Sequence, residues 1–318
     1  MTTKQAPIHS GFGAQTTARE VIGNRRLDGL TAVVTGGYAG VGLETTRALS
    51  GAGATVIVPA RTLDKARTAL AGVDRVEIES LDLIDPKSID AFATRFLASG
   101  RPLHILINNA GIMATPLVRD ARGFESQLAT NHLGHFQLTE RLWPALVRAN
   151  GARVVCLSSR GHIRAGVDFD DPNFELCPYD KWIAYGQSKT ATALFAVALD
   201  KRGEPHRIRA FSVHPGAVIT ELMRSMSEEE VKAALARSRE VGTFKDTEQG
   251  AATSVWCATS PRLEGMGGVY CEDCDIAEAV PADFPEQRGV RLWAMDPSLA
   301  ERLWTMSEEM TGVPSAAN

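Results

Sequence analysis

The chain has 318 residues, a formal net charge of -4 and five cysteines. This length is typical of one large α/β domain, and a nearly balanced charge argues against a nucleic-acid partner or an anionic membrane. The cysteines are scattered and odd in number, which argues against a disulfide framework, and residues 1–30 hold no apolar segment of signal-peptide type. We therefore expect a cytoplasmic protein that acts on a small soluble molecule and binds no membrane.

From Leu30 onward, short β-branched segments alternate with helical patterns. This alternation is typical of a doubly wound parallel sheet with helices on both faces. Seven strands are predicted, at Thr31–Thr35, Ala54–Val58, Arg75–Ile78, Leu103–Ile107, Arg153–Leu157, Arg207–Val213 and Gly268–Tyr270. Helices are predicted near residues 41–52, 62–70, 86–98, 124–149, 182–202 and 246–259.

Other segments interrupt or flank this alternation. Residues 1–29 form an N-terminal extension with a short helix near Thr17–Ile22, and residues 292–318 form a C-terminal helix and tail, so the domain itself spans residues 30–291. Within it, residues 160–181 and 217–245 are long connections that follow strand ends. Because open α/β sheets bind ligands at the carboxyl ends of their strands, we expect both connections to shape a substrate pocket.

The first strand runs into a glycine-rich turn that opens a helix. The spacing is Thr-Gly-x3-Gly-x-Gly, and glycines there let the backbone approach a phosphate at the positive end of the helix. The strand, turn and helix together predict a dinucleotide site. Its expected residues are Thr35, Gly36, Tyr38, Ala39, Gly40, Val41 and Gly42.

The residue after the second strand favours NADP(H). Arg61 stands where an enzyme that prefers NAD usually carries an acid for the ribose hydroxyls, and an arginine can hold a 2′-phosphate with charge-assisted hydrogen bonds. NADP(H) is thus the preferred cofactor and NAD(H) the alternative. Asp82 and Leu83 are expected at the adenine, although Asp82 also fits a loop residue that caps the turn before Pro86.

Strand four ends in two asparagines followed by two small residues. Asn109, Ala110 and Gly111 are expected to let the main chain pass close to the cofactor while the carboxamide ties neighbouring loops together. A plain turn is the rival interpretation, since Asn and Gly are common turn formers.

Tyr185 and Lys189 are four residues apart in a predicted helix, so their side chains share one face. A nearby positive charge favours phenolate over phenol and brings the tyrosine toward a useful acid/base range. Alone, the pair fits an ordinary half-exposed helix face. The motifs upstream of it favour a catalytic interpretation.

Together these segments resemble the short-chain dehydrogenase/reductase family over roughly residues 30–275. The resemblance implies a single Rossmann-type domain and a catalytic set of Asn131, Ser159, Tyr185 and Lys189. It also implies that the segment after strand six contacts the nicotinamide, through Pro215, Gly216, Val218 and Thr220. The longer spacing from Ser159 to Tyr185 is similar to the retinol-dehydrogenase and WW-domain-oxidoreductase branch, in its bacterial form; no WW domain is present.

The resemblance and the chemistry of the side chains assign roles. Tyr185 would give a proton to a carbonyl oxygen or take one from an alcohol, and Lys189 would lower the pKa of Tyr185. Ser159 would hydrogen-bond the substrate oxygen, with Ser158 as the neighbouring candidate that strand alternation sends to the opposite side. Asn131 would hold a water through a local helix distortion, or else is an ordinary helix residue.

We therefore expect an NADP(H)-dependent oxidoreductase that interconverts a carbonyl and an alcohol on a moderately hydrophobic molecule. The alternatives are an NAD-linked alcohol dehydrogenase and a non-catalytic cofactor-binding scaffold or sensor. A hydrophobic substrate is favoured by the aromatic residues of the first long connection and the following helix start, Phe169, Phe174, Tyr179 and Trp182.

No metal site is predicted. Cys271 and Cys274 have the spacing of half a zinc site without a second pair, and no hydrolase or metalloprotease motif accompanies the histidines at 132, 135 and 162. The run Thr190–Leu199 is apolar on nearly all sides, which predicts a homodimer through the helices near 124–149 and 182–202.

Overall fold

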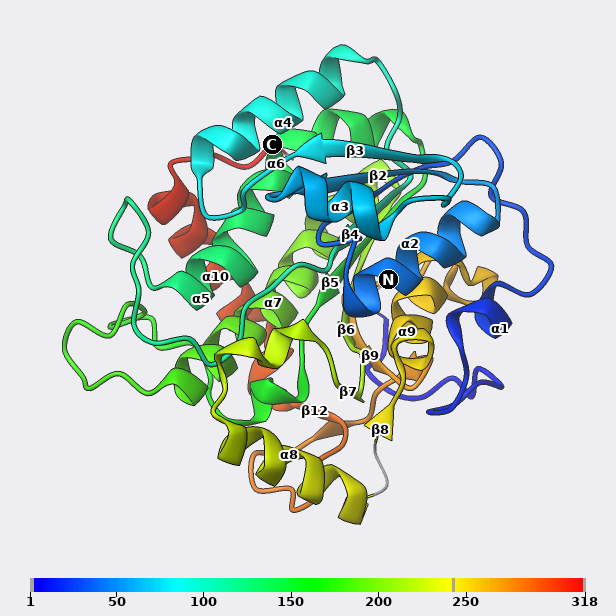
Figure 1. Ribbon diagram of the computed structural model, residues 1–318. Coiled ribbons are helices and arrows are strands. Elements are labelled where there is room, and N and C mark those ends of the chain that lie inside the picture. The colour runs from blue at the N-terminus through cyan, green and yellow to red at the C-terminus, as the bar shows by residue number, and fades with distance from the viewer. Residues whose placement is uncertain (1–2, 242–243, 317–318) are drawn as a thin grey trace.

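A central sheet with helices on both faces organises the chain (Figure 1), and this computed structural model describes residues 3–241 and 244–316. The strand order is β10-β9-β6-β5-β4-β1-β2-β3. All seven predicted strands are present and pair in parallel: β1 Thr31–Val34, β2 Thr55–Ala60, β3 Val76–Ser80, β4 Ile105–Asn108, β5 Ala152–Leu157, β6 Ile208–His214 and β9 Val269–Glu272. The eighth strand, β10 (Asp275–Ile276), runs antiparallel to β9 and was not predicted, because two residues carry no periodic signal.

Successive residues of the inner strands face two separate cores. Val33 and Leu106 belong to one buried cluster, whereas Val34 and Ile105 belong to the other. This alternation explains why these strands are continuously apolar, since both faces of the sheet are covered.

The helices divide between the two faces of the sheet. One cluster includes residues of α1 (Ala18–Ile22), α2 (Gly40–Gly51) and α9 (Thr247–Thr259). The other includes residues of α4 (Pro86–Ala98), α6 (Gly134–Arg148), α7 (Lys181–Gly203) and α10 (Pro297–Thr311). The short α3 (Leu63–Ala69) links β2 to β3, and a small separate pair, β11 (Ala279–Val280) and β12 (Val290–Arg291), precedes α10.

The helix predicted over residues 124–149 is interrupted. It consists of α5 (Ser126–Leu128), a π-helical turn at Ala129–Leu133 and then α6. Gly134 lies against the segment that follows β3, where an added Cβ would be 2.3 Å from the Leu83 carbonyl oxygen. Asn131 lies inside the π-helical turn, so the local distortion expected there is confirmed.

The connection at 217–245 contains a helix that the sequence analysis missed. It begins with β7 (Ala217–Val218), continues into α8 (Glu228–Val241), and ends with β8 (Phe244–Lys245), which pairs in parallel with β7; residues 242 and 243 lie outside the described residues. At the start of α8, Ser227 and Glu230 bond reciprocally, with each side chain accepting the other's backbone N–H. This capping pair was a sequence signal for the helix.

The C-terminal helix covers the face that we had assigned to a dimer. Trp304 of α10 lies 5.0 Å from the ring of Phe136 in α6 and 5.8 Å from that of Phe195 in α7, measured between centroids. Ser307 also hydrogen-bonds His132 at 2.7 Å. The apolar run Thr190–Leu199 is therefore buried within one chain, and its composition no longer calls for a second copy.

Within the described residues, no helix is long and apolar enough to cross a membrane.

Candidate active site

A cavity of about 710 Å³ lies at the carboxyl ends of the parallel strands. Its wall includes residues that follow six of these strands, as expected for an open α/β sheet. Three of the four predicted catalytic residues line it, namely Ser159, Tyr185 and Lys189, whereas Asn131 does not. All predicted cofactor residues line it as well: Thr35, Gly36, Tyr38, Ala39, Gly40, Val41, Gly42, Arg61, Asp82, Leu83, Asn109, Ala110, Gly111, Pro215, Gly216, Val218 and Thr220.

The glycine-rich turn is tied to the turn after β4. Asn109 donates its side-chain N–H to the Thr35 carbonyl at 2.8 Å, and the Thr35 hydroxyl accepts the backbone N–H groups of Asn109 and Ala110. Gly42 permits this contact, because a Cβ at that position would lie 2.4 Å from both Asn109 Nδ2 and Gly36 O. The two turns therefore form one closely packed unit.

This unit fits a phosphate group. Ala39, the residue before α2, makes no side-chain hydrogen bond to cap the helix, so the first backbone N–H groups of α2 remain donors at its positive end. Ala39, Gly40 and Val41 all line the cavity. Backbone donors on a glycine turn at a helix start are the usual means of binding a dinucleotide phosphate.

Two basic residues border the cavity beyond β2. Arg61 forms no ion pair among the described residues, while Lys65, one turn further along in α3, pairs with Glu221 of the opposite wall. Lys65 was missed because it lies inside a helix rather than in the glycine-rich turn. Asp82 lines the cavity but also accepts the Ile84 backbone N–H at 3.2 Å, so its side chain takes part in its own turn as the rival interpretation expected.

Tyr185 and Ser159 are packed together. Gly161 lies against the Tyr185 ring, since a Cβ there would be 2.7 Å from Tyr185 Cε1. Ser159 caps the 3₁₀ turn Arg160–Ile163 by accepting the Gly161 N–H at 3.0 Å. Ser158 instead donates to the Lys189 carbonyl at 2.7 Å and is buried, so the two hydroxyls have different surroundings.

Lys189 lies on the same face of α7 as Tyr185. Its Nζ is 5.7 Å from the centroid of the Tyr185 ring and donates to the Leu157 carbonyl at 2.8 Å. Burial lowers the pKa of Lys189 to about 8. Burial raises the pKa of Tyr185 to about 12, against the opposing effect of its hydrogen bond with Ser159.

The Tyr185 pKa is therefore raised in this structure, whereas the sequence predicted that it would be lowered toward neutrality. The physical reason is burial, which is the largest effect on the Tyr185 pKa and outweighs the opposing hydrogen bond with Ser159. At neutral pH the pair consists of a phenol beside an ammonium group, which is a proton donor next to a cation.

The side chain and the backbone carbonyl of Asn131 form hydrogen bonds with other protein groups. Its Oδ1 accepts the Ile112 N–H at 2.9 Å, and its Nδ2 donates to the Ile112 carbonyl and to the Ser188 hydroxyl. The backbone carbonyl of Asn131 accepts from His135 at 3.0 Å. Asn131 thus fastens the chain after β4 to α7, and its side chain does not reach the cavity.

His162 supports the turn that carries Ser159, a contact that the sequence analysis missed. Its Nδ1 donates to the Ser159 carbonyl at 2.8 Å and its Nε2 accepts the Arg291 N–H at 3.2 Å. Burial lowers the pKa of His162 to about 4, so the ring is neutral near pH 7.

No group of three His, Cys, Asp or Glu side chains suited to a metal is found in the described part of the chain.

The two long connections contribute unequally to the cavity. Residues 160–181 supply only Arg160 and Arg164 to the cavity wall. Phe169 packs against the hydrophobic core, and the rings of Phe174 and Tyr179 pack against each other. Trp182, at the start of α7, does line it. The segment after β6 contributes more of the wall, including the previously unassigned Ile219, Leu222, Met223, Met226 and Phe244.

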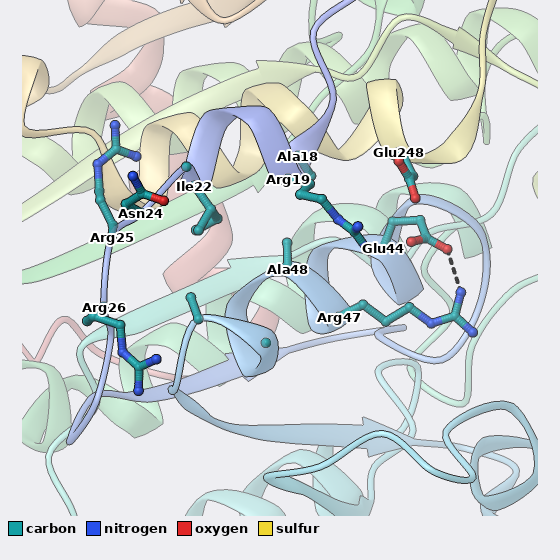
Figure 2. Close-up of a pocket in the computed structure, with 13 residues that line it drawn as sticks. Ala18, Arg19, Ile22, Asn24, Arg25, Arg26, Glu44, Arg47, Ala48 and Glu248 are labelled. Carbon is teal, nitrogen blue, oxygen red and sulfur yellow. Dashed lines mark hydrogen bonds and ion pairs between the residues drawn. The ribbon is translucent and has the colours of Figure 1, made fainter.

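A second cavity, of about 620 Å³, lies between α1 and α2 (Figure 2). Arg47 in its wall pairs with Glu44, as the dashed line in Figure 2 marks, and Arg26 pairs with Asp28. It shares no lining residue with the larger cavity. None of the predicted site residues lies there.

Comparison with known proteins identifies the class. Residues 30–231 match the family described as short chain dehydrogenase. The chain is 43% identical over 290 residues to a "Probable oxidoreductase" of Streptomyces antibioticus, covering 87% of this chain and 96% of that protein. It is 38% identical over 300 residues to retinol dehydrogenase 12 of Mus musculus, covering 91% and 89%. A crystal structure of a Mycobacterium Paratuberculosis protein matches with a TM-score of 0.71 and 31% identity, covering 94% and 98%.

The chain belongs to the short-chain dehydrogenase/reductase family, with relatives in its retinol-dehydrogenase-like branch. It is an NAD(P)-dependent dehydrogenase or reductase that acts on CH–OH groups. The scaffold alternative is thereby left without support.

Proposed function

We propose that the protein interconverts a carbonyl and an alcohol on a moderately hydrophobic small molecule and prefers NADP(H). The observation that carries this proposal is the convergence of Ser159, Tyr185 and Lys189 on the cavity that the glycine-rich turn borders. A nicotinamide cofactor held there supplies or accepts the hydride.

Tyr185 is the proton donor in carbonyl reduction. Its pKa near 12 keeps the phenol protonated at neutral pH, as a general acid requires. The Ser159 hydroxyl hydrogen-bonds the substrate oxygen and stabilises the charge that develops on it. Lys189, charged below about pH 8, favours transfer of the proton away from Tyr185. Asn131 keeps the chain beside Gly111 in place, through its bonds to Ile112.

The basic residues beyond β2 support the NADP(H) preference. Arg61 is exposed, has no ion-pair partner among the described residues and borders the cavity, and Lys65 lies one turn away. A 2′-phosphate on the ribose would give Arg61 a partner for bidentate, charge-assisted hydrogen bonds. The alternative is an NAD-linked alcohol dehydrogenase.

Arg61→Ala discriminates the two cofactors. We expect the NADPH dissociation constant to rise by about 10-fold or more, since a hydrogen bond to a charged group contributes roughly 1.5–3 kcal/mol. The NADH dissociation constant should change little. Arg67→Ala is the matched control, because Arg67 lies in α3, six residues after Arg61, pairs with Asp64 and does not border the cavity. Equal weakening of both cofactors, or no change in NADPH affinity, would contradict the preference.

The substrate-side wall supports a hydrophobic substrate. Trp182, Met223, Met226 and Phe244 offer apolar surface in the same cavity that Ser159, Tyr185 and Lys189 line. A cytoplasmic location and a homodimer through α6 and α7 stay predictions; light scattering of the purified protein tests the dimer, and a monomer at all working concentrations would remove it.

A further inference from the structure

Two side-chain N–H groups near Ser159 have no hydrogen-bond partner among the described residues. Arg160 directly follows Ser159, and His214 ends β6 just before Pro215; both line the large cavity. The Nε of Arg160 and the Nε2 of His214 are buried and make no hydrogen bond with any described residue. Twelve other buried side-chain atoms of the described residues also lack a partner, but only these two belong to residues that line the large cavity.

The protonation of His214 follows from its one contact. Its Nδ1 accepts the backbone N–H of Arg160 at 3.2 Å, so in the neutral ring the proton lies on Nε2. The side chain is only 5% exposed, and burial holds its pKa well below the usual range. His214, a residue of the cavity wall, is therefore neutral, and its Nε2–H group is enclosed and unpaired.

Arg160 has no ion-pair partner at close range among the described residues. It forms no ion pair with a described residue, although Glu272, His162, Tyr270 and His214 all lie close enough for its charge to affect their pKa. Glu272 accepts the Gly289 N–H at 2.7 Å.

The neighbouring cations differ in their partners. Lys245 is neutralised by Asp273 at 2.6 Å, whereas Arg164, also on the cavity wall, stacks on Trp182 and forms no ion pair among the described residues. A partly buried guanidinium without an anion is unfavourable, so the wall next to Ser159 suits a negatively charged ligand.

We propose that Arg160 and His214 form a subsite for a carboxylate of the substrate, next to the carbonyl or alcohol that reacts. The proposal rests on the proposed function and refines its substrate class to hydrophobic oxo or hydroxy acids. A carboxylate in the cavity would form an ion pair with the Arg160 guanidinium and, with a small rotation of the His214 ring, would accept from its Nε2–H. A doubly charged phosphate is less suited, because the carboxyl group of Glu272 lies nearby.

The test compares two ketones that differ in one charge, 4-acetylbenzoate and 4-acetylbenzamide. Each is titrated into the NADP⁺-loaded protein by calorimetry, so that binding is measured without reduction. We expect the acid to bind about 10-fold or more tightly than the amide, as for a hydrogen bond to a charged group. Arg160→Gln should reduce this ratio to about 1–3, and Arg160→Lys, which keeps the charge, should retain part of it.

Arg148→Gln is the control, because it makes the same change of charge at the C-terminal end of α6, outside the cavity. The subsite is overturned if the amide binds as tightly as the acid, if neither compound binds, or if Arg160→Gln leaves the ratio unchanged. Reduction by NADPH separates the two proposals. If the amide is reduced and the acid is not preferred, the subsite fails and the proposed function stands. If the acid binds through Arg160 but neither ketone is reduced, the proposed function fails for this class.

Discussion

Replacing Gly42 with alanine should disrupt the contact between the two turns that line the cofactor end of the cavity. The new Cβ would lie 2.4 Å from Asn109 Nδ2 and from Gly36 O, so the 2.8 Å bond from Asn109 to the Thr35 carbonyl must break or the turn must move. Overpacking costs roughly 1–3 kcal/mol and a lost buried hydrogen bond roughly 1–3 kcal/mol, against a gain of roughly 0.5–1 kcal/mol for alanine over glycine in a helix. We expect a net loss of about 1–5 kcal/mol.

The same helix supplies the matched control. Gly51 ends α2, and a Cβ there would meet nothing within 4 Å, so Gly51→Ala should leave stability unchanged or raise it by roughly 0.4–1 kcal/mol. Urea unfolding gives the free energies, and a fluorescence titration gives NADPH affinity, which should fall in Gly42→Ala alone. A Gly42→Ala protein as stable as the wild type, with unchanged NADPH affinity, would refute the close contact between the turns.

Two further predictions concern pH. The rate of carbonyl reduction should fall as pH rises through about 8, because Lys189 then loses its charge while Tyr185 keeps its proton up to about 12; a rate that stays flat well above that pH would contradict this role of Lys189. Glu140 is 2% exposed, and burial together with Glu308 raises its pKa from 4.5 to about 7, against the Ala316 N–H that it accepts and the charge of Arg202. The folded state thus holds more protons than the unfolded state between these values, and stability falls as pH rises through the window. Glu140→Gln should therefore add up to about 3 kcal/mol at pH 8 and little at pH 5, measured by urea unfolding at both; a difference independent of pH would exclude a buried carboxyl of this kind.

The sheet was predictable because its strands are buried on both faces. Segments such as Thr31–Val34 are continuously apolar, and the glycines after β1 follow a spacing that only a close backbone approach requires. The same motifs identified the candidate site residues along the chain. Parallel pairing then brought the ends of distant strands to one cavity, as the topology requires.

What the sequence did not reveal depends on contacts between distant segments. The inward packing of α7 needs Trp304, more than a hundred residues later, so the sequence pattern alone did not show that one chain covers this apolar run. The pKa of Tyr185 depends on burial, which outweighs a charge four residues away. The orphaned donors of Arg160 and His214 arise only where β5 and β6 end side by side.

The most direct test of the central claim, that the Tyr185 hydroxyl transfers the proton, is Tyr185→Phe, which removes one oxygen atom. The wild type and the variant are compared for NADPH-dependent reduction over a carbonyl panel and for NADPH affinity. We predict a fall in kcat of about 100-fold or more, with NADPH affinity unchanged within about 2-fold. Turnover that survives the loss of this hydroxyl would contradict the account.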